Sequence, residues 1–172
     1  VKQAAEKYTK STGMKHLFLT VALCLAAFVL CPSIATAQRG ETVVGINAGY
    51  ASHNHSGYSN IYFQFTPVNH LRLSPEIGYI YRHEGMSAVN FALDVQSPFK
   101  VSRGVAVYPL AGFVFNRWDV KDGDNFSRAG VNLGGGLDFY FTNFFKVGVQ
   151  AKYSFLKDTD GVFVGLGLGY IF

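Results

Sequence analysis

Histidine and serine residues gather in one polar stretch, and they are the side chains of this sequence best suited to catalysis. His53 and His55 stand beside Ser56, and His83 is followed directly by Glu84. A serine-type hydrolase needs a His base beside a Ser nucleophile and an acid that orients the base. Hydrophilic residues of a surface loop give the same pattern, and we favour that simpler interpretation.

Two further patterns resemble metal sites but lack ligands. His53 and His55 would share one face of an extended strand, yet two imidazoles in a loop make a weak site. Asp122-Gly-Asp124 lacks the rest of a calcium loop, including its closing Glu. The sequence therefore predicts no catalytic residue, no metal site and no cofactor.

The lone tryptophan gives the best candidate for contact with a partner. Trp118 follows Arg117 in a polar segment, 116–128, that we expect to be a surface loop. Trp and Arg are the residue types that most often dominate contact energies at interfaces. We therefore predict that this pair anchors any partner that binds the loops.

The elements that must position these residues are strands, and residues 161–172 show the pattern most clearly. Large apolar side chains alternate there with a second face that is mostly glycine. A period of two indicates a strand, and a strand of about 9–11 residues crosses a bilayer when it is tilted. Six further segments alternate in the same way, and the least regular one, 103–115, is apolar on both faces, with Phe113 and Phe115 expected to face lipid. We expect a local distortion at Pro75 because proline cannot donate to a ladder. The eight expected strands are 42–51, 60–66, 70–81, 87–96, 103–115, 129–141, 144–155 and 161–172.

The placement of charge decides which face of these strands lies inside. Large apolar residues form unbroken rows on one face, and six charged residues lie on the other. Charges of balanced sign cannot stay unpaired in a dry cavity, whereas apolar rows of this length would make a poor soluble surface. We predict an all-β fold, an eight-stranded antiparallel up-and-down transmembrane β-barrel with a narrow lumen filled by side chains. The expected lumen charge network is Arg72, Glu76, Asp94, Asp138, Lys146 and Lys152.

The turns and aromatic residues indicate which end is which. The connections 67–69, 97–100 and 142–143 are short, whereas 52–59, 82–86, 116–128 and 156–160 are mostly longer and more polar. Short turns on the inner side and long loops outside are expected of such barrels. Aromatic residues also collect near both ends of the strands, which predicts two girdles at the membrane interfaces.

The first 37 residues carry an export pattern. Residues 14–37 have a positive start, an apolar core too short to span a membrane comfortably, and an Ala-x-Ala site, so they read as a cleaved signal peptide. Residues 1–13 read as an upstream extension, which leaves 38–172 as the barrel domain. Residues 1–37 hold both cysteines, four of the 15 Lys and Arg, and one of the 11 Asp and Glu. The 11 basic and 10 acidic residues that remain do not indicate a nucleic-acid partner.

The signal peptide, the eight alternating strands and the terminal Phe172 together resemble the small bacterial outer-membrane barrels of the OmpA/OmpX type. This resemblance implies an outer-membrane location, contact with outer-membrane lipids and lipopolysaccharide, and assembly by the barrel-assembly machinery. It also implies that Tyr170 and Phe172 belong to a C-terminal insertion signal. The expected role is structural, or an interaction with an extracellular partner through the loops, and not catalysis.

Two alternatives stay open. Some small outer-membrane barrels are enzymes that modify lipid A, and His55 with Ser56 would be the residues to test. A periplasmic barrel of the lipocalin type, which binds lipid, would need a polar outside and an apolar inside. The predicted placement of charges is the reverse of that pattern.

Overall fold

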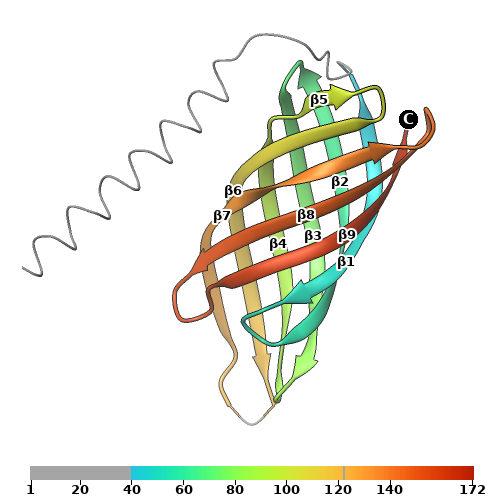
Figure 1. The fold of residues 1–172 in the computed structure, drawn as a ribbon. Helices are drawn as coiled ribbons and strands as arrows, with labels where there is room; N and C mark the ends of the chain where they lie inside the picture. The colour runs from blue at the N-terminus through green and yellow to red at the C-terminus, as the bar shows by residue number, and fades with distance from the viewer. Residues whose placement is uncertain (1–39, 122) are drawn as a thin grey trace, which may run out of the picture. The chain divides into compact units, whose positions relative to one another are not determined.

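The computed structural model describes residues 40–121 and 123–172, which form nine strands (Figure 1). The predicted extension 1–13 and signal peptide 14–37 lie outside the described residues. No helix with the length and apolar character of a membrane span occurs among the described residues. The strands are β1 (Thr42–Ala51), β2 (Ser56–Val68), β3 (Leu71–His83), β4 (Met86–Gln96), β5 (Phe99–Ser102), β6 (Val105–Val120), β7 (Phe126–Tyr140), β8 (Phe145–Leu156) and β9 (Gly161–Ile171).

Eight of these strands close into a barrel. Neighbouring strands pair antiparallel in the order β4-β3-β2-β1-β9-β8-β7-β6, and β4 also pairs with β6. The first strand, β1, pairs with the last strand, β9, and the paired residues run from Val43 with Ile171 to Ala51 with Phe163. The predicted fold class, an eight-stranded antiparallel up-and-down barrel, is confirmed.

The short strand β5 corrects the predicted position of one turn. Gln96 of β4 pairs with Leu110, and Phe99 of β5 pairs with Val107, so both strands keep one register against β6. Strand β5 is thus the continuation of β4 after a break at Pro98, which has no backbone N–H to donate. The predicted turn at 97–100 is wrong, and the chain turns instead at residues 103–104.

The strands are longer than the alternating apolar pattern predicted. The predicted loops 52–59, 82–86 and 116–128 shrink to connections 52–55, 84–85 and 121–125. In the second of these, Glu84 and Gly85 have φ of 50° and 83°, as a two-residue type I′ turn requires. Polar strand ends still form ladder hydrogen bonds, so polarity alone was a poor signal for a loop. The expected difference in length between the connections at the two ends of the barrel therefore largely disappears.

Pro75 lies where the ladder between β2 and β3 is irregular. Pairs run from Tyr62–Glu76 to Phe65–Leu73 with none at Pro75, and the register shifts between Phe65 and Val68. On its other side Pro75 pairs normally with Leu93 of β4. The register is the same at Tyr62–Glu76 and at Phe65–Leu73, so the register shift lies beyond Pro75, and the irregularity at the proline is limited to missing pairs with β2.

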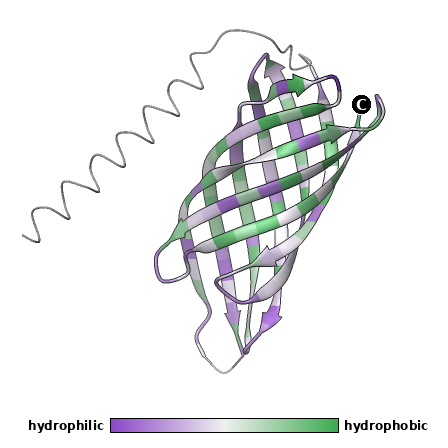
Figure 2. Ribbon diagram, in the orientation of Figure 1, coloured by the Kyte–Doolittle hydropathy of each residue, from purple (hydrophilic) through white to green (hydrophobic). Residues whose placement is uncertain are grey.

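The two faces of the strands differ sharply in chemistry. In β9, Val162, Val164, Leu166, Leu168 and Tyr170 are exposed while every residue between them is buried. The least regular segment obeys the same rule, since Phe113 and Phe115 of β6 are also exposed. Figure 2 shows the resulting alternation of apolar and polar residues along the strands. The apolar rows face outward, and the polar and small residues face the lumen.

Candidate functional site

The lumen holds all six charged residues predicted to lie inside. Their exposed fractions run from 0% for Asp94 to 6% for Glu76. Each comes from an inward position of a strand, and four strands contribute: β3, β4, β7 and β8. The strands bring these residues together as two separate ion clusters.

The first cluster is centred on Lys152. Its ammonium donates to Glu76 Oε2 at 2.8 Å and to Asp94 Oδ2 at 2.9 Å. Two amides complete the cluster: Asn60 Nδ2 donates to Glu76 at 2.8 Å, and Asn132 Nδ2 donates to Asp94 Oδ1 at 2.9 Å. Every charge in this cluster is therefore paired and further hydrogen-bonded, which is the condition under which buried charge is tolerated.

The second cluster is centred on Asp138. Arg72 Nη1 lies 2.6 Å and Lys146 Nζ 3.1 Å from Asp138 Oδ2. Lys146 also donates to Gln64 Oε1 at 2.6 Å and lies 3.9 Å from Glu41 Oε1. Glu41 was not among the residues predicted to lie inside, because it precedes the first expected strand. Its inward position could still have been predicted, because residue 41 continues the alternation that buries residues 43 and 45.

Tyrosine rings that pack against glycines fill the rest of the lumen. A Cβ on Gly45 would overlap the ring of Tyr62, and a Cβ on Gly165 would overlap the Tyr58 hydroxyl. Tyr108 lies beneath the guanidinium of Arg72, whose Cζ is 4.6 Å from the ring centroid. The cavity beside Lys152 measures about 10 Å³, which is room for about one water molecule. These contacts describe a packed interior.

An apolar cluster lies at one end of the lumen and overturns the predicted surface role of Trp118. Trp118 is on β6, is 1% exposed, and packs in a cluster with other inward residues. Arg117, the preceding residue, faces outward and is exposed, but it also lies in the strand. The prediction of a loop anchor is wrong because the ladder with β4 and β7 continues through both residues. The buried cluster is Ala51, Tyr58, Ile80, Ala88, Trp118 and Phe163.

The histidines and the serine do not assemble into a nucleophile–base pair. Ser56 accepts from Asn54 Nδ2 at 3.2 Å and donates to the carbonyl of Gly57. His55 Nδ1 lies 3.0 Å from the Tyr50 hydroxyl, and no hydrogen bond joins Ser56 to a histidine within residues 40–121 and 123–172. Across those same residues no group of three or more His, Cys, Asp or Glu is placed to hold a metal.

His53 instead lies at the end of the lumen that holds the Trp118 cluster. Its ring meets that of Trp118 edge to face, with centroids 5.4 Å apart. Burial lowers the pKa of His53 below its ordinary value, and the nearby carboxylate of Asp160 offsets part of this effect. The neutral imidazole is therefore the form that fits this environment.

A closed antiparallel barrel with an apolar outside and paired charges inside is the construction of a transmembrane barrel. Solved structures with this construction are similar to the chain. They include the N-terminal β-barrel domain of Pseudomonas aeruginosa OprF, with a TM-score of 0.66, 17% identity, and coverage of 78% of this chain and 98% of that one. Neisserial surface protein A gives a TM-score of 0.63 and 16% identity, with 77% and 97% covered. Ail, the attachment invasion locus protein of Yersinia pestis, gives 0.58 and 18%, with 78% and 100% covered.

These likenesses establish the fold, which is that of the small eight-stranded outer-membrane barrels of the OmpA/OmpX type. No family profile matches the chain, and no curated protein sequence matches it.

Proposed function

We propose that this chain is a bacterial outer-membrane protein whose barrel is a closed scaffold with a structural or surface-interaction role. One observation carries the proposal: exposed apolar rows surround a lumen in which the charges are paired with one another. Lipid removes the cost of the apolar exterior, which would be an aggregation liability in water. The lumen in turn has no need of a ligand to satisfy its charges.

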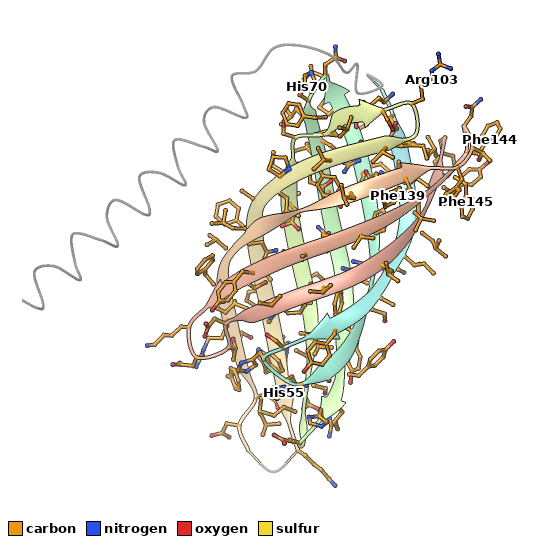
Figure 3. The ribbon with its side chains drawn as sticks, in the orientation of Figure 1. His55, His70, Arg103, Phe139, Phe144 and Phe145 are labelled. Atoms are coloured by element: carbon orange, nitrogen blue, oxygen red, sulfur yellow. The ribbon has the colours of Figure 1, made fainter. Side chains whose placement is uncertain are left out.

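The predicted insertion signal, Tyr170 and Phe172, gives the proposed orientation. We place the end with β5 and Phe172 in the periplasm and call it the periplasmic end; the connections 52–55, 84–85, 121–125 and 157–160 form the outer end. The signal peptide 14–37 would deliver the chain across the inner membrane. Tyr170 and Phe172, both exposed on the outward face, would then serve as the insertion signal for the barrel-assembly machinery. Phe139, Phe144 and Phe145 gather near that end in Figure 3.

The partners that this arrangement supports are outer-membrane lipids and lipopolysaccharide around the barrel, and an extracellular partner at the outer end. The short connections leave little loop surface, so the exposed strand ends would contribute to any contact. One barrel of this fold, Ail, has been solved in complex with the heparin analogue sucrose octasulfate. For this chain the partner is a proposal about chemistry at the outer end and not about catalysis.

A conductance measurement tests the closed lumen. We expect purified protein in planar lipid bilayers to show no large, stable channels, because the two ion clusters and the tyrosines occupy the interior. A large and stable conductance that persists after repeated purification would contradict the scaffold proposal.

Cysteine labelling on intact cells tests the orientation. Both native cysteines fall within the predicted signal peptide, so single substitutions in the barrel can be labelled cleanly. Asp158→Cys, in the connection between β8 and β9, should react with a membrane-impermeant maleimide on intact cells. Asn143→Cys, in the connection between β7 and β8, should react only after the outer membrane is permeabilised. The reverse result would overturn the orientation.

A further inference from the structure

A polar cavity of about 90 Å³ opens at the periplasmic end of the barrel. Strand β5, its turn to β6, and the turn between β7 and β8 build it, and we call it the basic vestibule. The residue Lys100 faces inward, since its ladder partner Ala106 is buried in the lumen. The residues that line the vestibule are Lys100, Ser102, Arg103, Val105, Tyr140, Thr142, Asn143 and Ile171.

Two cations of the vestibule lack an acidic partner. Neither Lys100 nor Arg103 takes part in an ion pair with any residue in the described part of the chain. Lys100 Nζ lies 6.0 Å from the centroid of the Tyr140 ring, so the ammonium points toward the ring of another residue that lines the cavity. Arg103 lines the cavity from the turn at the rim of the same end, and its exposed side chain points away from the barrel (Figure 3).

Glu41, whose partner Tyr140 lines the vestibule, does not cancel this charge. Glu41 accepts a hydrogen bond from the Tyr140 hydroxyl at 3.2 Å, and the ammonium of Lys146 lies 3.9 Å away. Glu41 is also 7% exposed, so its charge is directed at the lumen cluster below the vestibule. The vestibule therefore keeps a net positive charge of its own, with room for a small group.

We propose that the basic vestibule binds a phosphate group. Lysine supplies a point charge and arginine a planar fork of donors, which is the pairing that phosphate oxygens prefer. Ser102 and Thr142 add hydroxyls and Asn143 adds an amide, so donors of three chemical kinds line one small cavity. The volume is several times that needed for one water molecule, which suits an oxyanion better than an isolated solvent molecule.

The phosphate can come from two sources. One is free phosphate or a soluble phosphate ester in the periplasm, and the other is the headgroup of a phospholipid in the adjoining leaflet. Naming these sources rests on the proposed orientation, whereas the binding site itself does not depend on it.

Binding of inorganic phosphate to the full barrel in maltoside micelles tests the proposal, by calorimetric titration or phosphorus NMR. We expect saturable binding by the native protein and a loss of roughly tenfold or more in affinity in Lys100→Gln/Arg103→Gln, because about 1.4 kcal/mol of charge-assisted bonding corresponds to a factor of ten. The matched control Lys121→Gln/Lys157→Gln removes two exposed lysines at the outer end and should keep the native affinity.

Competition in the maltoside micelles, which contain no phosphate, separates the two sources. Displacement of bound phosphate by added phosphatidylglycerol, but not by an equal charge of a fatty carboxylate, would support the site and assign it to a lipid headgroup. No displacement by either amphiphile would support the site and assign it to a soluble phosphate. Two results would overturn the proposal: no saturable binding by the native barrel, or the same affinity in the double variant. A barrel that inserts and labels as expected, yet fails to bind phosphate, would refute this inference and leave the proposed scaffold function intact.

Discussion

Removing the ammonium of Lys152 should strongly destabilise the barrel. Lys152 is 5% exposed and lies 2.8 Å from Glu76 and 2.9 Å from Asp94. In Lys152→Met the methylene stem is largely kept, but both carboxylates lose their cation. They then remain buried in a space with room for about one water molecule.

The expected magnitude follows from these distances. Unit charges about 3 Å apart attract by about 5–6 kcal/mol at an effective dielectric constant of about 20. The variant forfeits two such attractions but recovers the cost of desolvating the ammonium, which is several kcal/mol. Breaking a buried pair from one side therefore costs about 3–5 kcal/mol of unfolding free energy.

Urea unfolding in lipid vesicles, followed by tryptophan fluorescence, measures this cost directly. The chain has a single tryptophan, Trp118, which is 1% exposed in the folded barrel. The triple variant Lys152→Met/Glu76→Gln/Asp94→Asn should recover most of the loss, since it leaves no uncompensated charge. The control Lys157→Met changes an exposed lysine and should stay within about 0.5 kcal/mol of the native protein. A loss below about 1 kcal/mol in the single variant would refute the argument that the cluster is paired and dry.

Two further predictions use the same unfolding assay. Gly45→Ala places a Cβ against the Tyr62 ring and should lower the free energy of unfolding by about 1–3 kcal/mol. Gly167→Ala, where a Cβ meets ordinary contacts at 3.4 Å or more, should lower it less. Equal losses in the two variants would argue against the packing of tyrosine rings on glycines. Because burial lowers the pKa of His53, its contribution is complete above about pH 6.5, the ordinary value, and is lost as pH falls through the lower folded-state pKa. His53→Gln should flatten this decline and the exposed-site control His55→Gln should keep it; a decline that persists in His53→Gln would exclude His53 as its source.

The sequence was sufficient for the fold because one pattern was repeated along most of the chain. Alternation in segments such as 161–172 identifies a strand and both of its faces at once. The inward placement of Arg72, Lys146 and Lys152 followed from parity alone, since neighbours in a strand point to opposite faces. Which cation meets which carboxylate could not follow, because the pairs join residues as distant as Arg72 and Asp138, whose meeting depends on the register of the closed barrel.

The predictions failed at the strand ends. Trp118 was assigned to a loop because its neighbours are polar, although backbone hydrogen bonds hold it in β6 with its ring in the lumen. The turn predicted at 97–100 failed for the opposite reason. Pro98 interrupts the ladder for only a short distance, and β5 resumes the register of β4 beyond it. Polar composition indicates which part of a strand is exposed to water, whereas the length of the strand is set by pairing with its neighbours.

The most direct test of a closed membrane barrel is its mobility on a detergent gel with and without boiling, after cell fractionation. A barrel that stays folded in detergent is compact, so the unboiled protein should run faster than the boiled protein. It should be recovered with the outer membrane. A single band with no shift, recovered in the soluble periplasmic fraction, would contradict the assignment of the apolar face to lipid.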